Sequence, residues 1–293
     1  MGWLWRFLKR LFGFGRKRHR SVFEQIVAPA NMAAALAKVQ RRARENGLSE
    51  AELARFIAAG RDKLETLRQD LIRGRYRPGG VKRFSIAKPD GGRRGLTMLT
   101  LADRIAQTAA NQVLTPLLDA EFSEASFGYR PNRSLADALD RVKALRGRGH
   151  TFVVDADIER CFDRLRHDRI VDRLRESVAD RRLIRLVESW LAAFADGARG
   201  LPQGAPLSPL LCNVALDPID QGLARGPGVL VRFSDDFLIL CRSRREAEDA
   251  RRRAADLLNR QGLRFNAQKT RVTTFADGFF FLGHYFVHDL MLR

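Results

Sequence analysis

The sequence predicts an α+β fold in which hairpins are joined by helices. Apolar runs at residues 229–233 and 237–240 flank Ser234-Asp235-Asp236, and β-branched runs around such turn formers are typical of a hairpin. An alternating run at residues 81–87 enters a Pro-Asp-Gly-Gly turn, which indicates a second hairpin. Helical patterns separate these segments, over residues 31–75, 101–118 and 244–258.

The chain is strongly basic. Its 293 residues are enough for one large or two small domains, and 53 Lys and Arg against 34 Asp and Glu give a net charge of +19. Such a surplus attracts polyanions, most simply nucleic acid, with an anionic membrane surface as the competing partner. The three cysteines are scattered among apolar residues, which predicts reduced thiols in the cytoplasm. No apolar run approaches the ~20 residues that cross a bilayer, and we expect nucleic acid as the partner ahead of a membrane surface.

Residues 1–20 form a basic amphipathic segment. They hold seven Lys and Arg residues and no acidic one, and Trp3, Phe7 and Leu11 share one helical stripe. Such a helix can lie on nucleic acid or on a membrane, or it can dock onto the body of the protein. The sequence leaves these three alternatives open.

Two pairs of aspartates are candidates for a metal site. Asp155 and Asp157 follow a buried apolar strand and precede a helix predicted to run to about Leu174, while Asp235 and Asp236 lie at the tip of the later hairpin. Adjacent ionised carboxylates repel one another unless a cation compensates, and magnesium prefers carboxylate and phosphate oxygens. If Asp157 meets the hairpin tip, three carboxylates can hold two magnesium ions for in-line phosphoryl displacement. The alternatives are a helix cap at Asp155 or Asp157 and a solvated turn at the tip.

Three loops carry side chains that suit nucleotides or nucleic acid. Lys88 and Arg94 lie on opposite sides of the glycine-rich turn, where two cations suit a triphosphate, although a solvated basic hairpin is at least as common. The aromatic and basic side chains at residues 127–131 suit stacking and phosphate contacts, and packing explains Phe127 and Tyr129 equally well. Gln203 and Gly204 precede a helix, where an amide can bond a base edge or sugar, or where the loop is purely structural.

Seven motifs, taken together and in order, resemble the reverse transcriptases, and within them the group II intron-like bacterial branch. The resemblance covers roughly residues 75–286. The motifs are Lys-Pro-Asp-Gly-Gly-Arg-Arg (88–94), Phe-Gly-Tyr-Arg-Pro (127–131), Asp-Ile-Glu-Arg-Cys-Phe-Asp (157–163), Pro-Gln-Gly-Ala-Pro-Leu-Ser-Pro (202–209), Phe-Ser-Asp-Asp (233–236), Asn-Ala-Gln-Lys-Thr (266–270) and Phe-Leu-Gly-His (281–284). One motif alone is weak evidence, whereas seven in the order of the family favour the catalytic interpretation of the aspartates.

The resemblance implies a right-hand polymerase with fingers and a palm, in which the palm is an antiparallel sheet backed by helices. The implied division is a basic N-terminal segment at 1–20, a helical extension at 21–80, fingers at 81–150, a palm with part of the fingers inserted at 151–286, and a truncated start of a thumb or linker at 287–293. The thumb is expected to be absent or minimal. A partner protein, with the CRISPR adaptation integrase as one candidate, is therefore expected to supply the missing grip on the duplex.

The same resemblance implies a metal site. Two magnesium ions, with manganese as an alternative, are expected to be bound by Asp157, Ile158, Asp235 and Asp236, of which the three aspartates are the catalytic residues.

The resemblance also implies which residues contact the substrates. The incoming nucleotide is expected to meet Lys88, Arg94, Phe162, Gln203, Gly204 and Lys269. Phe162 would be the aromatic gate that collides with a 2′-hydroxyl, and Lys269 a candidate general acid for pyrophosphate. Primer or template contacts are expected from Phe233, Arg130 and His284.

The implied activity is RNA-directed DNA synthesis, in which a DNA or RNA primer on an RNA template is extended with deoxynucleoside triphosphates. The setting would be a mobile element or a CRISPR-linked or antiviral defence system. Phe233 stands where the family usually has Tyr, and Ser234 where Ala is frequent, and we expect neither change to abolish activity. The alternatives are an RNA-dependent RNA polymerase, an untemplated nucleotidyl transferase, and a non-catalytic nucleic-acid-binding protein that keeps the polymerase fold.

Overall fold

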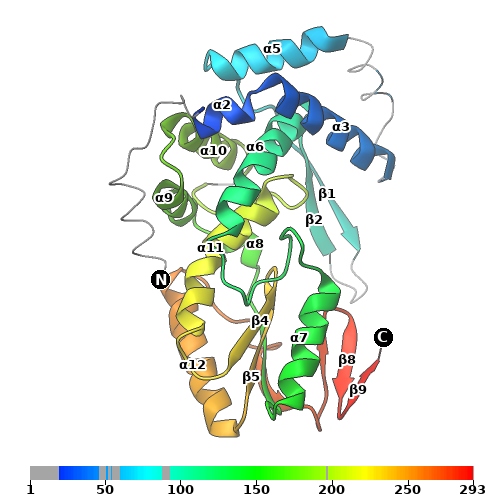
Figure 1. Ribbon diagram of the computed structural model, residues 1–293, viewed down its shortest axis with the longest axis vertical. Coiled ribbons are helices and arrows are strands. Elements are labelled where there is room, and N and C mark those ends of the chain that lie inside the picture. The colour runs from blue at the N-terminus through cyan, green and yellow to red at the C-terminus, as the bar shows by residue number, and fades with distance from the viewer. Residues whose placement is uncertain are drawn as a thin grey trace.

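The computed structural model describes residues 20–45, 51, 54, 60–87, 93–195 and 197–292, and its fold is α+β, as the sequence predicts. The helices nearest the N-terminus lie at one end of the molecule and the main sheet lies at the other (Figure 1). The expected amphipathic segment, apart from Arg20, falls outside the described residues, and so does Lys88.

A four-stranded antiparallel sheet lies at the centre of the second end. Its order is β4-β5-β3-β6, and each strand pairs antiparallel with its neighbour. The strands are β3 (Phe152–Asp157), β4 (Val229–Phe233), β5 (Asp236–Cys241) and β6 (Arg271–Thr274). The hairpin predicted around Ser234 is confirmed, and the buried strand that begins at Phe152 continues past its apolar run to Asp157.

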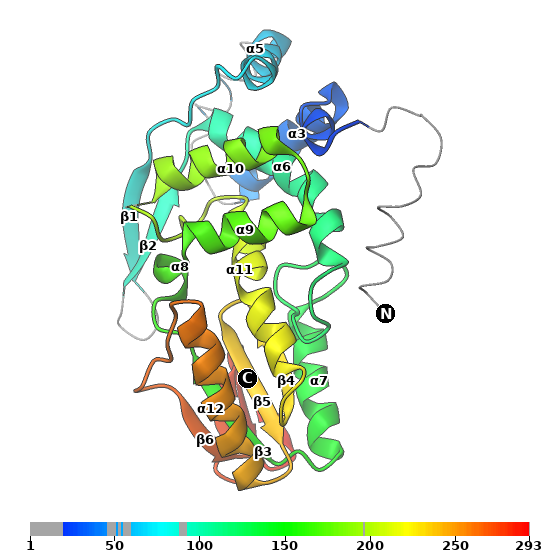
Figure 2. The same cartoon turned by 90° about the vertical axis from the view of Figure 1, so that its left-hand side faces the viewer.

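Helices and strands cover both faces of this sheet. The covering helices are α7 (Leu135–Gly147), α11 (Ser208–Leu223) and α12 (Arg244–Arg260). Because successive side chains of a strand point to opposite faces, Val154 and Ile239 pack in the core that contains α11 and α12, whereas Val153 and Leu238 pack with α7. Figure 2 shows α12 in front of the sheet, and Figure 1 shows α7 over the opposite face.

The helical end of the molecule packs around one long helix, α6. Its helices are α2 (Val22–Ile26), α3 (Pro29–Glu45), α5 (Gly60–Ile72), α6 (Leu101–Asp119) and α10 (Arg181–Phe194). Their buried apolar side chains belong to the same cluster as those of α11 and α12, so one continuous core joins the two ends. In the described part of the chain, no helix is long and apolar enough to cross a bilayer.

The helix predicted to run to Leu174 is interrupted, so that prediction is wrong. It divides into α8 (Cys161–Arg164) and α9 (His167–Ser177), with Leu165 in an extended conformation between them. Leu165 is buried, and its carbonyl accepts a hydrogen bond from Gly200 N at 2.8 Å. In a continuous helix the Leu165 carbonyl would accept a hydrogen bond from within the helix, whereas here it accepts one from the loop after α10. The residues around Leu165 do not predict this long-range contact.

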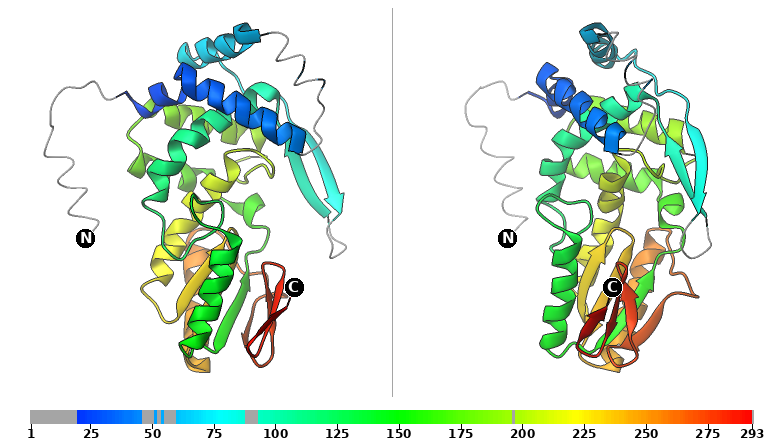
Figure 3. Two further views of the ribbon diagram at one scale, coloured as in Figure 1. Left: turned by 45° about the vertical axis from the view of Figure 1, so that its right-hand side comes forward. Right: turned by 90° about the vertical axis from the view of Figure 1, so that its right-hand side faces the viewer.

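Two smaller sheets lie on one side of the molecule, the first above the second (Figure 3). Their strands are β1 (Lys82–Ala87), β2 (Arg93–Met98), β7 (Phe279–Phe281), β8 (His284–Val287) and β9 (Leu290–Leu292). The first sheet is the predicted β1–β2 hairpin, which is exposed along all of β1. The second, β7-β8-β9, places Phe279, Phe281 and Phe286 against the α7 face of the main sheet.

Candidate active site

The acidic tip of the β4–β5 hairpin is a tight two-residue turn. Phe233 and Asp236 are the last paired residues, which leaves Ser234 and Asp235 as the turn itself. Ser234 has a positive φ of 62°, as the first residue of such a turn requires in order to follow the twist of the strands. The turn thus presents Asp235 beyond the end of the sheet, while Asp236 is the first residue of β5.

The third predicted carboxylate meets this tip. Strand β3 pairs with β5 in a register that sets Asp157 directly opposite Asp236. Paired residues on antiparallel strands have Cα atoms about 4.5–5.5 Å apart, so the two side chains lie on one face as neighbours. The predicted convergence of Asp157 with the hairpin tip is confirmed. The catalytic role of these residues stays a prediction.

The carboxyl group of Asp236 is costly to ionise in this position. Although Asp236 is exposed at the start of β5, the surrounding protein partly desolvates its carboxyl group and raises its pKa to about 6, and the charges of Asp235 and Asp157 act in the same direction. Within the described ranges, no group of three or more His, Cys, Asp or Glu side chains is already arranged to hold a metal ion. The donor set nevertheless fits one, because hard divalent cations bind carboxylate oxygens and relieve such repulsion. Ile158 is buried and apolar, so only its main-chain oxygen can take the expected part in such a site.

A pocket of about 430 Å³ opens beside the carboxylates, and it is lined by Asp155, Asp157, Asp236, Lys269, Arg271 and the 280–283 segment, among others. Two cations line its wall. Lys269 Nζ lies 3.6 Å from Asp157 Oδ2, and Arg271 Nε lies 3.5 Å from Asp155 Oδ2. Burial raises the pKa of Asp155 although Arg271 opposes the shift. The pocket therefore combines acidic and basic groups, as a site for metal ions and phosphates requires.

The residues expected to meet the nucleotide are only partly brought together in the described structure. The Gln203 carbonyl accepts from Thr97 N of β2 at 2.8 Å, and a Cβ at Gly204 would lie 3.1 Å from the Thr97 carbonyl oxygen. Gly204 also has a φ of 100°, so this close approach to β2 requires glycine. The backbone of Arg94 lies in the same strand, but its side chain, like all of Lys88, is outside the described parts.

Phe162, the expected gate, lies in α8 and is half-buried against the main core. Its carbonyl accepts from Leu201 N at 2.7 Å, so the gate and the 203–204 loop are joined through neighbouring main chain. Its contact with a nucleotide stays a prediction.

The three residues expected at the primer or template differ in their surroundings. The ring of Phe233 lies 6.2 Å from that of Tyr129, which is 59% exposed. His284 is half-buried in β8, where Nδ1 donates to the Leu282 carbonyl at 3.0 Å. Both residues are therefore near the carboxylate tip or its pocket.

Arg130, the third residue expected at the primer or template, is buried. It is only 8% exposed, and its guanidinium donates to Asp119 Oδ1 at 2.6 Å and to the carbonyls of Ser123 and Ser126 at 2.6 and 2.9 Å. Through these internal contacts Arg130 stabilises the loop to which it belongs. Its contact with nucleic acid remains a prediction that this burial argues against.

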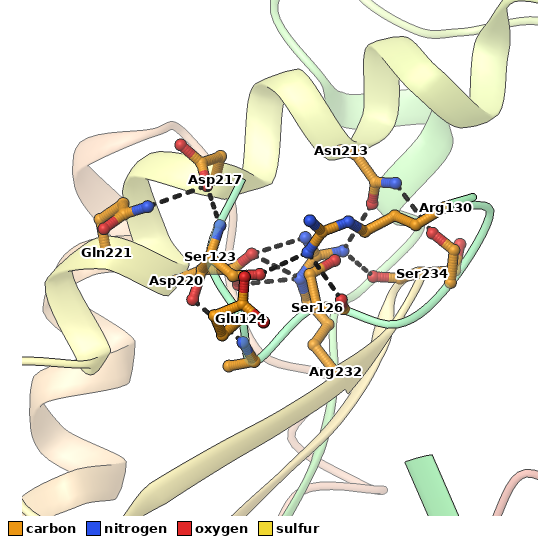
Figure 4. Close-up of polar contacts among 12 residues, drawn as sticks. Ser123, Glu124, Ser126, Arg130, Asn213, Asp217, Asp220, Gln221, Arg232 and Ser234 are labelled. Carbon is orange, nitrogen blue, oxygen red and sulfur yellow. Dashed lines mark hydrogen bonds and ion pairs between the residues drawn. The ribbon is translucent and has the colours of Figure 1, made fainter. Parts of the chain in front are cut away.

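Sequence reasoning missed a buried polar network behind the turn. Arg232, in the middle of the apolar β4 run, contacts Asp220 and Asn213 of α11 (Figure 4). The sequence could have predicted this network, because a charged residue inside an apolar, buried strand requires a partner of opposite charge or a hydrogen-bond acceptor. Asn213, Asp217 and Asp220 are the matching signal, since they are polar residues on one otherwise apolar helix.

Comparison with known proteins places this geometry in a family. The sequence profile of "Reverse transcriptase (RNA-dependent DNA polymerase)" matches residues 86–286. Protein YkfC of Escherichia coli (strain K12) is 29% identical over 268 residues, covering 76% of this chain and 70% of YkfC. The group II intron-encoded protein LtrA of Lactococcus lactis subsp. cremoris is 32% identical over 168 residues, covering 55% of this chain and 28% of LtrA.

Among solved structures, a chain of the partial Cas6-RT-Cas1–Cas2 complex is 30% identical, with a TM-score of 0.49, and the match covers 83% of this chain and 42% of that one. The chain thus spans less than half the length of some of its relatives. The family profile, however, matches well over half of the chain and includes the carboxylate tip, the strand before it and the pocket wall. The chain therefore belongs to the reverse transcriptases, the RNA-directed DNA polymerases.

Proposed function

We propose that this chain extends a primer 3′ end with deoxynucleotides on an RNA template, and that Asp157, Asp235 and Asp236 bind two magnesium ions at the site of reaction. The observation that carries the proposal is the register of β3 with β5, which sets Asp157 opposite Asp236. Reverse transcriptases typically use a divalent metal ion. Two such ions, when bound, stabilise the attacking and leaving oxygens of an in-line displacement.

The side chains around the carboxylates support the same proposal. Lys269, 3.6 Å from Asp157, lies where it can hold a proton for the leaving pyrophosphate. The main chain of Phe162 is fixed by α8 and by the Leu201 contact, and its ring packs against the main core, so the ring would be held in one place to select the ribose. The β1–β2 hairpin lies next to the 203–204 loop and would bring Lys88 and Arg94 toward the triphosphate.

We also propose the division into fingers and palm, with one adjustment to its bounds. The four-stranded sheet with α11 and α12 would be the palm, and the β1–β2 hairpin with the helical end would be the fingers. Helix α7 falls in the predicted 81–150 fingers segment, but it packs on β4 and β5. We therefore assign α7 to the palm, while α8, α9 and α10 form the inserted part of the fingers.

Primer extension on an RNA template with magnesium tests the activity. Each deoxynucleotide and each ribonucleotide is supplied separately, with an unprimed reaction as a control. Templated incorporation of deoxynucleotides alone is the expected result. Preference for ribonucleotides would indicate an RNA-dependent RNA polymerase, incorporation that ignores the template would indicate a terminal transferase, and no incorporation would leave a non-catalytic binding protein.

Two broader expectations also remain proposals. A partner protein would supply additional grip on the duplex, and the chain would act in a mobile element or a CRISPR-linked or antiviral defence system. Copurification of the full chain from its native cells, followed by measurement of product length with and without any partner found, tests both. Long products from the isolated chain would count against a required partner.

A further inference from the structure

Arg232 is an unusual residue for the core that surrounds it. It is only 2% exposed, and it is the largest of the fully buried side chains in the described part of the chain. It belongs to β4 and faces α11, and it lies two residues before the turn formed by Ser234 and Asp235. A guanidinium is costly to bury unless it is paired and hydrogen-bonded, so its presence here requires an explanation.

The charge of Arg232 is matched by a buried carboxylate on α11. Nε lies 2.8 Å from Asp220 Oδ1 and Nη2 lies 2.6 Å from Oδ2, which is a two-point contact between planar groups. Asp220 is itself only 1% exposed. Although burial opposes the charge, attraction to Asp220 raises the pKa of Arg232, so the side chain stays ionised.

The third nitrogen of the same guanidinium reaches the catalytic turn. Arg232 Nη1 donates to the Ser234 carbonyl oxygen at 2.7 Å and to Asn213 Oδ1 at 3.0 Å (Figure 4). Ser234 is the turn residue with positive φ, and its carbonyl belongs to the peptide bond that joins it to Asp235. The helix α11 is thus connected through one side chain to the peptide unit that carries the first tip carboxylate.

A loop holds the turn from the other side. Asn213 Nδ2 donates to the Gly128 carbonyl at 2.9 Å, and a Cβ at Gly128 would lie only 2.5 Å from Ser234 N. The main chain of Arg232 also pairs with this loop, since its N–H donates to the Ala125 carbonyl and its carbonyl accepts from Phe127 N, both at 2.8 Å. The turn is therefore enclosed between α11 and the loop before Arg130.

Stability alone does not explain this arrangement. Replacing a buried ion pair with apolar residues of similar volume is often neutral or stabilising, so a core does not need one. An apolar residue at 232 could fill the same space, but it could not donate to the Ser234 carbonyl. Catalytic groups need to be held within about 0.5 Å of their working positions, and a charged donor from a rigid helix–strand contact supplies such a restraint.

We propose that Arg232, fixed by Asp220 and Asn213, is a positioning residue that holds the Ser234–Asp235 turn so that the tip carboxylates stay beside Asp157. Arg232 touches no substrate and acts only through the turn. Its consequence for catalysis rests on the proposed function, whereas its effect on the turn does not.

The test compares Arg232→Lys with Arg173→Lys in the full chain. Lysine keeps the charge but cannot reach Asp220, Asn213 and Ser234 together. Arg173 is a matched control, because it is a half-buried arginine that donates to Asp217 on the same helix, at 3.2 Å, and makes no contact with the turn. Both variants lose one arginine–aspartate pair at α11, so a purely structural effect would appear in both.

The first measurement is hydrogen exchange of the peptide that spans residues 229–241, followed by mass spectrometry. In Arg232→Lys we expect the turn amides to exchange roughly 10- to 100-fold faster, as expected from the loss of a hydrogen bond to a charged group, and no such change in Arg173→Lys. Equal exchange in the two variants would overturn the proposal. This measurement needs no metal and no activity.

The second measurement is the magnesium concentration that gives half-maximal primer extension, determined at a temperature where each variant is folded. Loss of a group that orients a metal ligand typically costs roughly 10- to 100-fold in metal affinity or activity, and we expect that change only in Arg232→Lys, with primer–template affinity unchanged. Altered exchange with unaltered magnesium dependence would overturn the link to catalysis. A wild-type chain without activity would refute the proposed function, and the exchange result would still decide the positioning claim.

A second variant covers the case in which Arg232→Lys does not fold. Asn213→Ala keeps the Arg232–Asp220 pair and removes only the contacts to the guanidinium and to Gly128. We expect a smaller change in the same direction for both the exchange rate and the magnesium dependence. Wild-type behaviour in both would contradict the role assigned to the network.

Discussion

Asp235 and Asp236 are held together by the backbone, against their own repulsion. A two-residue turn makes them neighbours, and the β3–β5 register adds Asp157. Partial desolvation and the two neighbouring charges raise the pKa of Asp236 to about 6, and a bound cation would relieve the repulsion that contributes to this shift. The resemblance of the motifs to the reverse transcriptases predicted this meeting, whereas the local pattern of apolar strands and aspartates left it conditional.

Asp235→Ala tests the carboxylate cluster most directly. Because Asp235 is only half-buried and the main chain of its turn is held by Arg232, we expect the fold to persist and primer extension to fall by at least roughly a hundredfold, the scale of losing one strong electrostatic stabiliser. Extension assays and thermal unfolding measure the two effects. Asp140→Ala, at an exposed aspartate on α7, is the control, and an Asp235→Ala protein with wild-type activity would refute the metal assignment.

Tyr76→Phe tests a buried hydrogen-bond chain in the helical end. The Tyr76 hydroxyl donates to Asp103 and accepts from Trp190 Nε1 at 2.9 Å, while Asp103 also accepts from Gly79 N at 3.1 Å, just before β1. Without the hydroxyl, Asp103 and Trp190 each lose a partner, and we expect the free energy of unfolding to fall by about 1–3 kcal/mol.

Urea unfolding measures this loss. Tyr285→Phe is its control, because that exposed hydroxyl makes only a 3.5 Å contact with the Asp277 carbonyl and should change stability by no more than about 0.5 kcal/mol. Equal effects of the two substitutions would contradict the buried role of Tyr76.

At the level of elements, the hairpins and most helices follow from local pattern, while the exceptions follow from contacts that are distant in sequence. The helix expected to reach Leu174 is broken at Leu165 by the 198–201 loop, which lies beyond the next two helices. Arg130 was expected to contact primer or template, yet its guanidinium is bound inside the protein by Asp119 and by the carbonyls of Ser123 and Ser126. A sequence pattern can predict such a contact only if it includes both of the residues that make it.

Gly128→Ala tests how tightly the 123–134 loop encloses the hairpin. A Cβ there would lie 2.5 Å from Ser234 N and 3.1 Å from the Phe233 carbonyl carbon, so main chain would have to move. Overpacking of this kind costs about 1–3 kcal/mol, and the displaced turn should also lose activity.

The measurement for Gly128→Ala is thermal unfolding together with primer extension. Gly147→Ala is the matched control, because a Cβ at the end of α7 meets nothing within 4 Å and is expected to leave both unchanged. A stable and active Gly128→Ala protein would show that the loop is not pressed against the turn in solution.

At the scale of the whole molecule, one core runs from the N-terminal helices to the sheet, and all three cysteines are buried in it. The composition predicted reduced thiols, and the structure adds why they should be inert. Burial raises the pKa of Cys241 to about 12, and a hydrogen bond with Cys212 and burial raise that of Cys161. What the composition could not give is which residues share this core, because that depends on how both faces of the sheet are covered.

Alkylation with iodoacetamide at pH 8 tests this core. Only the thiolate reacts, and a thiol whose pKa is about 12 is almost entirely protonated at pH 8, so Cys241 should react roughly a thousandfold more slowly than an unperturbed thiol. Unfolding in urea returns the pKa to its ordinary value, and all three cysteines should then label quickly. Fast labelling of the native chain would mean that the core opens readily.

The pairing of Asp157 with Asp236 has a consequence for how this chain can change over evolutionary time. Side chains of a strand alternate between faces, so a single-codon deletion or duplication within residues 152–157 would turn Asp157 toward α11 and α12 and point an apolar residue at the pocket. Such an in-frame change could keep all of the aspartates and still separate Asp157 from Asp235 and Asp236. Length variation among relatives should therefore be excluded from this six-residue strand.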